Sequence, residues 1–398
     1  MNLISSNLSF LEHGLPAFVL RLLLVAILAV ESTGCDEPDP VPRPVSLKAV
    51  NIGFPPNVGG MGSFAVSPGG RVFVLMSTLT ASRLSELEGS LEEDSQVWVR
   101  REQPVMMSRF LRGFVEGLGL IGAGIRDGRW AHLAITDQGT TQLPGLADGT
   151  QIQPLLVAEN GAVIGVPEPE YGSTNSKLLR LAPGASAWVE IPGTDPSTRS
   201  GPAPASAVRH PNGKIYAMNG SRIFELAGDL SSATTLFDCD TRELGPCGES
   251  WLLVTGGLRL GGDGVLTFGK TNDEPELYSF RPGDSELTKR AVLRSPINEQ
   301  GYFGRPQGLV VDSEGTAYVV MRTEELGGEG HVLAHRSGDA PDEWVTVVTG
   351  LPSALQLQID GKDGIWLWGH SSETYTGLWK LVPSSTECPR CAGGDGSR

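Results

Sequence analysis

A short turn that ends in glycine recurs along the chain, and this recurrence is the feature that most constrains the fold. Each copy joins an apolar segment to a second segment rich in Val, Ile, Tyr, Phe or Trp. Asn-Gly and Asp-Gly pairs supply the positive φ angles that tight turns between antiparallel strands require. The sequence therefore predicts a series of β-hairpins. Their terminal glycines are Gly70, Gly128, Gly161, Gly213, Gly264, Gly315 and Gly364.

The spacing of these turns indicates the architecture. Successive glycines are separated by 58, 33, 52, 51, 51 and 49 residues, with a mean of 49. Strand repeats of about 40–50 residues are typical of β-propellers, in which each four-stranded blade buries its two faces against its neighbours. We therefore expect an all-β propeller of seven blades over residues 47–384. The uneven gaps beside Gly128, the weakest copy, leave six blades as an alternative.

Composition supports strands rather than helices. The 398 residues include 52 Gly and 28 Pro, which interrupt long helices, while 39% hydrophobic residues are enough to build a core. A second hairpin completes most units, for example segments 177–181 and 187–191. The last unit ends near Val382 and lacks a partner strand. Residues 47–52, at the other end of the domain, could supply this strand and close the ring.

One copy carries a family resemblance. Residues 306–320 contain a proline, a short apolar strand, Asp312, a glycine turn and a strand bearing Tyr318. This order resembles the repeat of the NHL, SMP-30 and streptogramin-lyase group of propellers. Residues 204–218 are similar, with His210 at the place of the aspartate. The resemblance implies a propeller fold more strongly than it implies an activity.

Enzymes of the SMP-30 and lactonase kind hold a divalent metal in the central channel, so the resemblance also raises the question of a metal site. The residues available for such a site are Asn51, Asn57, Asp263, Asp312 and Asp360. Turn formation accounts better for each of them, because Asx side chains cap the backbone of turns. We therefore predict neither a metal nor another cofactor.

The first residues indicate export. Residues 22–30 form an apolar run behind Arg21 that is shorter than the roughly 20 residues of a membrane span but suits a signal-peptide core. The sequence Ser32-Thr33-Gly34-Cys35, followed by a Pro-rich stretch, resembles the lipobox of bacterial lipoproteins, in which the cysteine carries the lipid. We expect a signal peptide over 1–34, a lipidated Cys35, and a tether over 35–46. Ser32 stands where this pattern has an aliphatic residue, so an ordinary signal peptide or an uncleaved anchor remains an alternative.

The other four cysteines fit an exported protein, in which disulfides are permitted. Cys239 and Cys247 flank a short loop that ends in Gly-Pro, and we expect a disulfide between them. Cys388 and Cys391 have the spacing of a redox motif in a tail over 385–398, but no helix follows them. A disulfide is favoured there, with thiol chemistry as the alternative.

Three further motifs match enzyme patterns only in spacing. The glycines of 117–122 fit a dinucleotide-binding motif, but the next strand turn leaves no room for the required helix. Residues 369–373 resemble a hydrolase nucleophile elbow, yet another strand follows instead of a helix. His331 and His335 would share a face on a helix, whereas on the expected strand they lie about 13 Å apart, too far for one metal.

The balance of charged residues limits the classes of ligand that the protein can bind. The chain has 31 Lys and Arg against 46 Asp and Glu, a net charge of −15, without a basic run, which argues against nucleic-acid binding. We expect a monomeric, lipid-anchored protein of the bacterial cell envelope that presents propeller loops to a protein, peptide or glycan. The alternative is a propeller enzyme, either a lyase or a metal-dependent hydrolase, with acidic residues in its central channel. A sensor or assembly component beside a membrane complex is a third possibility.

Overall fold

The computed structural model describes residues 47–53, 55, 61–77, 82–89, 97–101, 107–126, 129–168, 177–195, 205–220, 222–238, 252–253, 257–271, 276–292, 305–322, 330–336, 338–340, 343–351, 354–369 and 377–383. These residues form an all-β domain of seven antiparallel sheets. No helix long and apolar enough to cross a membrane occurs among them.

Four sheets make up the first part of the domain. Blade 1 contains β2 (Met61–Val66), β3 (Val72–Ser77), β4 (Ser82–Glu88) and β5 (Val97–Arg101). Blade 2 contains β6 (Met107–Val115), β7 (Gly119–Arg126), β8 (Arg129–Thr136) and β9 (Gly139–Gln142). Blade 3 contains β10 (Ile152–Val157), β11 (Val163–Pro167), β12 (Leu179–Leu181) and β13 (Val189–Glu190). Blade 4 contains β14 (Ser206–Arg209), β15 (Ile215–Asn219), β16 (Arg222–Leu226) and β17 (Ala233–Asp238).

Three sheets complete the domain. Blade 5 contains β18 (Leu252–Leu253), β19 (Arg259–Leu260), β20 (Leu266–Thr271), β21 (Glu276–Phe280) and β22 (Thr288–Val292). Blade 6 contains β23 (Arg305–Val311), β24 (Ala317–Arg322), β25 (Gly330–His335) and β26 (Val345–Leu351). Blade 7 contains β27 (Ala354–Ile359), β28 (Ile365–Gly369), β29 (Gly377–Pro383) and β1 (Leu47–Gly53).

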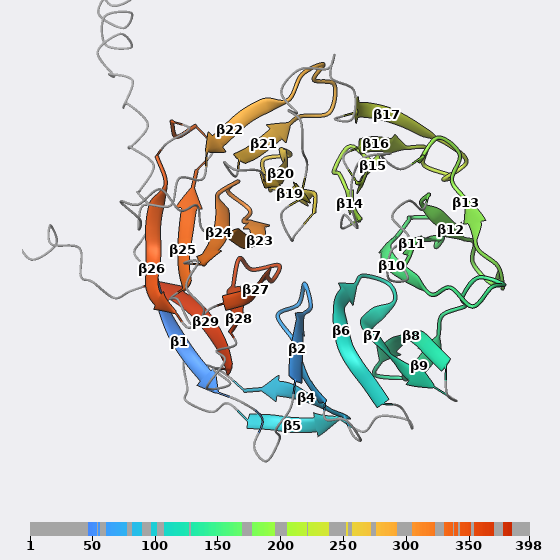
Figure 1. The fold of residues 1–398 in the computed structure, drawn as a ribbon, viewed down its shortest axis with the longest axis horizontal. Coiled ribbons are helices and arrows are strands. Elements are labelled where there is room, and N and C mark those ends of the chain that lie inside the picture. Colours follow the sequence, from blue (N-terminus) through green and yellow to red (C-terminus); the bar gives the residue numbers. More distant parts are fainter. Residues whose placement is uncertain are drawn as a thin grey trace, which may run out of the picture. The chain divides into compact units, whose positions relative to one another are not determined.

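The seven blades form a closed propeller, as the repeat spacing predicts. Figure 1 shows them around a centre, with the first strand of each blade on the inside. The ring closes where β1, blue in Figure 1, pairs with β29, red, in antiparallel register from Leu47 opposite Pro383. The prediction that residues 47–52 complete the last blade is thus confirmed. This pairing gives blade 7 its fourth strand. The other blades are four-stranded as well, except that the inner edge of blade 5 is divided between β18 and β19.

The structure corrects one of the seven repeat anchors. Gly128 does not end the innermost turn of blade 2, because it follows β7 rather than β6. That turn is Glu116–Leu118, in which Gly117 has a φ of 86°. The intervals from Gly70 to Gly117 and from Gly117 to Gly161 are 47 and 44 residues, which replaces the uneven 58 and 33. The irregularity that suggested six blades therefore came from choosing the wrong hairpin.

The hydrophobic core lies between adjacent blades. Trp366 and Trp368 of blade 7, for example, pack against Phe64 and Val74 of blade 1, and all four side chains are buried. The contact is close enough that a Cβ at Gly62 would lie 2.3 Å from the ring of Trp368. Apolar burial contributes about 25 cal/mol per Å². Because each blade needs both neighbours to cover its faces, this term favours closure of the whole ring.

Polar side chains also join the inner strands of neighbouring blades. The backbone N–H of Leu111 donates to Ser63 Oγ at 2.7 Å, which joins blade 2 to blade 1. Gln358 of blade 7 accepts from Val66 N at 2.8 Å and donates to Phe64 O at 3.1 Å. Such bonds satisfy inner-edge groups that no strand covers. They hold the rim of the channel in register.

Several predictions from the sequence lie outside the described residues. They comprise the signal peptide over 1–34, the lipidated Cys35, the tether over 35–46, the disulfide cysteines Cys239, Cys247, Cys388 and Cys391, and the tail over 385–398. They remain predictions.

Candidate functional site

The innermost strands carry an unusual charge. In a protein with a net charge of −15, strands β2, β6, β10, β14, β18, β19, β23 and β27 contain no Asp or Glu. The cations in these strands are Arg109, Arg112, Arg209, Arg259 and Arg305. The acidic lining that the enzyme alternative requires is therefore absent from the described inner strands. The innermost strands are thus basic in composition, whereas the protein as a whole is acidic.

A cavity of about 320 Å³ opens among the inner strands of blades 2 to 5. Its polar side chains are Arg112 from β6, Gln153 from β10, and Arg259 from β19, with Ser206 from β14. Phe114, Pro154 and Leu258 are among its apolar neighbours. Four blades thus contribute to one recess at the inner edge of the ring.

Arg259 is the exceptional residue of this cavity. Its Nε donates to the carbonyl oxygen of Leu309 in blade 6 at 3.1 Å, which fixes the guanidinium against the next blade. No carboxylate of the described residues pairs with it. Burial lowers the pKa of Arg259, and no nearby anion offsets that effect. An arginine nevertheless remains a cation at physiological pH, and no acceptor among the described residues pairs with its terminal N–H groups.

The local backbone holds Arg259 in this position. Gly257 has a φ of 66° and approaches blade 4 so closely that a Cβ there would lie 2.5 Å from Ser206. This approach brings the N–H of Leu258 to within 2.7 Å of Ser206 Oγ. Only glycine adopts such a conformation without strain. The Gly257–Ser206 contact therefore sets the position of the following Arg259.

Arg112, in the same cavity, belongs to a second polar cluster between blades 2 and 3. Its guanidinium forms an ion pair with Glu168, which also accepts from Trp130 Nε1 at 3.1 Å. The Nε2 of the buried His132 lies 3.3 Å from Glu168 Oε1. Burial alone would raise the pKa of Glu168, but His132, Arg112 and Trp130 together lower it. The charge of Arg112 is thus balanced by Glu168, whereas no carboxylate of the described residues balances that of Arg259.

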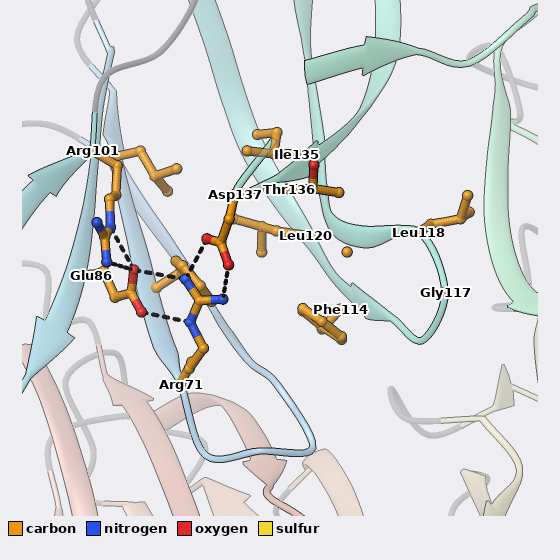
Figure 2. A pocket seen from close by; sticks show the side chains of 13 residues that line it. Arg71, Glu86, Arg101, Phe114, Gly117, Leu118, Leu120, Ile135, Thr136 and Asp137 are labelled. Atoms are coloured by element: carbon orange, nitrogen blue, oxygen red, sulfur yellow. Dashed lines mark hydrogen bonds and ion pairs between the residues drawn. The ribbon is translucent and has the colours of Figure 1, made fainter. Parts of the chain in front are cut away.

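A larger cavity of about 670 Å³ lies between blades 1 and 2. Figure 2 shows Arg71, Glu86 and Arg101 on its blade 1 side and Asp137 facing them from blade 2. The rest of the wall is mostly apolar. Its apolar side chains are Phe73, Leu84, Phe114, Leu118, Leu120 and Ile135.

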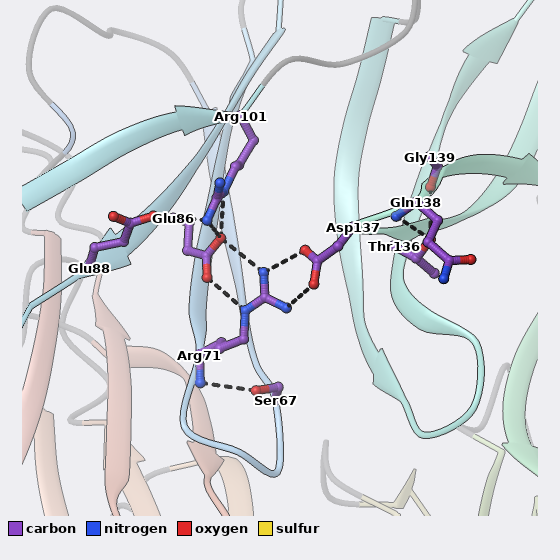
Figure 3. A network of polar contacts seen from close by, with 9 residues as sticks. All are labelled: Ser67, Arg71, Glu86, Glu88, Arg101, Thr136, Asp137, Gln138 and Gly139. Atoms are coloured by element: carbon purple, nitrogen blue, oxygen red, sulfur yellow. Dashed lines mark hydrogen bonds and ion pairs between the residues drawn. The ribbon is translucent and has the colours of Figure 1, made fainter.

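The charged residues of this larger cavity form one network (Figure 3). Glu86, only 5% exposed, accepts from Arg71 Nε at 2.7 Å and from Arg101 Nε at 2.6 Å. Arg71 also donates through both terminal nitrogens to Asp137, at 2.8 and 3.0 Å. Arg101 reaches Glu88 at 2.9 Å. Hydrogen bonds from Arg71 lower the pKa of Asp137, and those to Glu86 and Asp137 raise the pKa of Arg71.

The aspartates considered for a metal serve the turns instead. Asp312 Oδ1 accepts from the N–H groups of Glu314 and Thr316, and Asp312 Oδ2 accepts from Tyr318. Asp360 repeats this arrangement, with Trp366 in place of the tyrosine. These contacts confirm the predicted turn role.

The other candidate metal ligands either bond to the backbone of their own turns or lie outside the described residues. Asp263 Oδ1 accepts from Val265 N at 3.1 Å, and Asn51 Oδ1 from Gly53 N at 2.7 Å. Asn57 lies outside the described residues. No group of three potential metal ligands occurs among the described residues.

The other motifs are parts of strands and hairpins. Residues 117–122 form the turn and start of β7, without a helix. His331 and His335 both lie on β25, as predicted, and both are buried. Gly369 ends β28, and residues 370–373 are outside the described part of the chain.

Sequence reasoning did not find Arg259 or Arg71. Each is a single arginine without a motif around it, and its role depends on which blade lies next to it. One signal was available, because the first segment of every repeat lacks acidic residues although the chain is acidic overall. A comparison of the charged residues at equivalent positions of the repeats would have singled out the strands that line the channel.

Comparison with known proteins supports the fold. No family profile matches the chain. No curated protein matches it either. A catalytically inactive variant of virginiamycin B lyase from Staphylococcus aureus, solved with quinupristin, is 13% identical, with a TM-score of 0.54 over 84% of this chain and 99% of that chain. The selenomethionine form of the same lyase is 14% identical, with a TM-score of 0.51 and the same coverage.

A gluconolactonase from Xanthomonas campestris is 13% identical, with a TM-score of 0.43 over 85% of this chain and 90% of that chain. At these identities the likeness to the lyase concerns the fold, not the activity. It agrees with the resemblance of residues 306–320 to the streptogramin-lyase group. The chain is thus a seven-bladed β-propeller that shares its fold with virginiamycin B lyase.

Proposed function

We propose that this protein binds, in its central channel, a ligand that carries a carboxylate or phosphate group. The observation that carries the proposal is Arg259, a cation at the channel cavity with no carboxylate partner among the described residues. An anionic ligand would supply the missing partner.

The surroundings of Arg259 favour such a ligand. Charge-assisted hydrogen bonds to arginine are about twice as strong as neutral ones, and they strengthen further where water is partly excluded. The amide of Gln153 and the hydroxyl of Ser206 line the same cavity and can orient polar groups of the ligand. The cavity is lined by strands of four blades of one closed ring, and a site that is formed before binding lowers the entropic cost of binding.

The test compares two arginine variants by titration calorimetry at low ionic strength. Inorganic phosphate and galacturonate, an acidic sugar, serve as probes. Arg259→Gln should weaken binding of at least one probe by about tenfold or more, because hydrogen bonds to charged groups contribute about 1.5–3 kcal/mol. Arg281→Gln is the matched control, since Arg281 is an exposed arginine on a turn that donates to a backbone carbonyl.

The control should bind both probes like the wild type, and added salt should weaken the interaction by screening. Equal binding by the wild type and Arg259→Gln, or no binding of either probe by the wild type, would overturn the proposal.

We further propose that binding takes place at the bacterial cell envelope, with the protein held to the membrane by lipid on Cys35. The support is the apolar run of residues 22–30 followed by the lipobox-like junction. Replacing Cys35 by Ser should move the protein from the detergent phase to the aqueous phase in Triton X-114 partitioning. Partitioning that does not change in this variant would refute lipidation.

A second candidate function is lyase-like catalysis. Virginiamycin B lyase shares the fold, and in this chain Glu168 and His132 form an acid–base pair connected to the channel through Arg112. Quinupristin is the natural probe, because it was solved with the lyase variant. The binding proposal predicts that the probe stays intact. Turnover that is lost in Glu168→Gln would instead establish an enzyme.

A further inference from the structure

The cavity between blades 1 and 2 combines a cationic end with an apolar wall. We infer that it binds a small apolar monocarboxylate, with the ligand carboxylate on Arg71 in the position that Asp137 now occupies. This site shares only Phe114 with the lining of the channel cavity and does not rest on the proposed function.

Asp137 is placed as a substitute for such a ligand. It lies on the turn between β8 and β9 and contacts Arg71 of the neighbouring blade through both carboxylate oxygens, at 2.8 and 3.0 Å. Figure 2 shows the two groups facing each other beside the apolar part of the cavity. Two parallel bonds to one guanidinium are the geometry by which arginine recognises any carboxylate. A ligand carboxylate can therefore use the same donors.

The two carboxylates on Arg71 differ in how firmly they are held. The side chain of Glu86 is 5% exposed and bound by two arginines, whereas that of Asp137 is 75% exposed. Exposed ion pairs contribute little to stability, since water competes and side-chain freedom is lost. Glu86 therefore fixes Arg71 in place, and Asp137 can leave at little cost.

The remaining wall selects an apolar tail. Phe73, Leu84 and Leu120 belong to the core cluster between blades 1 and 2, and Phe114 and Ile135 pack against it. Leu118, on the innermost turn of blade 2, completes the wall. The volume of about 670 Å³ lies within the range of about 300–1,000 Å³ that is usual for small-molecule sites. A tail placed here would extend the existing core.

The charges around the cavity favour an anion over a cation. Both lining carboxylates, Glu86 and Asp137, already have arginine partners, so an incoming cation would find no unpaired carboxylate among the described lining residues. When Asp137 leaves, Arg71 and Arg101 balance Glu86 and Glu88, and Arg71 regains two free donors. A ligand carboxylate then restores the present arrangement.

The experiment measures affinity by calorimetry for octanoate, octanol, acetate and octylamine. Octanoate should bind at least tenfold more tightly than the other three, because it alone supplies both the charge and the tail. Asp137→Asn should tighten octanoate binding by about two- to fivefold, since it weakens the competing contact. Asp148→Asn makes the same charge change on another exposed turn and should leave the affinity unchanged.

Two further variants separate this site from the others. Arg71→Gln should weaken octanoate binding by tenfold or more, whereas Arg259→Gln should leave it unchanged. Phosphate binding in the channel should not respond to Asp137→Asn. The inference is overturned if octylamine or octanol binds as tightly as octanoate, if the wild type does not bind octanoate, or if Asp137→Asn fails to tighten binding. The last outcome does not depend on Arg71→Gln being able to fold.

Discussion

Single aspartate side chains in this fold make two kinds of contact, one within their own turn and one to the next strand. Asp312 closes its turn through one oxygen and holds Tyr318 of the next strand through the other. Burial raises the pKa of Asp312, and burial together with Asp312 raises the pKa of Tyr318. The same chemistry at Asp360 uses Trp366. The aspartates of the repeat are therefore occupied by structural contacts before any ligand arrives.

Replacing Gly257 by Ala tests how the channel is positioned. A Cβ there would meet Ser206 at 2.5 Å in a left-handed conformation, so we expect a loss of about 2–4 kcal/mol of stability. Gly149→Ala is the control, because Gly149 has a φ of 90° and nothing within 4 Å of its Cβ. It should cost only about 1–2 kcal/mol, the penalty of the left-handed backbone. Urea unfolding measures both, and equal losses would contradict the close approach.

His335 should make stability depend on pH. Burial lowers its pKa, and the nearby Arg290 acts in the same direction, against opposing contributions from the Ala340 carbonyl and Asp339. His335 therefore binds a proton more readily in the unfolded chain than in the folded chain. The free energy of unfolding should decrease as the pH falls below about 6.5, the ordinary pKa of histidine. His335→Gln should reduce this slope in urea titrations between pH 7.5 and 5. Glu168, whose pKa is lowered, adds its own loss only at more acidic pH.

Among the strands, β1 is the one that closes the ring. This strand of seven residues pairs with β29 and places Leu47 and Ala49 against the core between blades 6 and 7. Its role depends on pairing across more than 300 residues of sequence, from Leu47 to Pro383. Repeat counting predicted the missing partner strand, because the last unit was one strand short.

Ala49→Asp tests the closure. A carboxylate placed against the apolar core without a partner should lower the free energy of unfolding by about 2 kcal/mol or more. Lys48→Asp is the control in the same strand, because Lys48 is exposed and its replacement should cost less than about 0.5 kcal/mol. Thermal melts followed by circular dichroism compare the two. Equal effects would show that β1 contributes no buried contact.

The described domain is a ring in which each blade covers its faces against its neighbours. Core clusters join blade 7 to blade 1 and blade 4 to blade 5 in the same way, so stability is shared around the ring. The charge distribution, too, becomes visible only when all blades are compared. The innermost strands contain five arginines and no Asp or Glu, so the acidic residues of the domain lie on its other strands and on its turns.

A closed ring should unfold as one unit. Gly257→Ala and Ala49→Asp lie at different blade junctions, so their losses of stability should add to within about 0.5 kcal/mol in the double variant. Near-ultraviolet and far-ultraviolet circular dichroism should show a single coincident transition for all three proteins. A second transition in any of them would mean that part of the ring unfolds independently.

The sequence by itself determined the repeating hairpins, the closing strand and the turn role of Asp263, Asp312 and Asp360. The hairpins and turns depend on φ preferences and on apolar patterns within about fifty residues, and the closing strand follows from counting strands per repeat. The anchor at Gly128 was wrong, because blade 2 has glycine-containing turns both before and after β7.

Only the tertiary structure decided which side chains meet across blades. Arg259 was identified because no carboxylate of the described residues pairs with it, and Arg71 by its contact with Asp137, 66 residues further along the chain. Neither relation is local, because blade packing brings together residues about one repeat or more apart. The physical reason is that apolar burial specifies the ring, whereas the ring then decides which charges are paired and which remain available to a ligand.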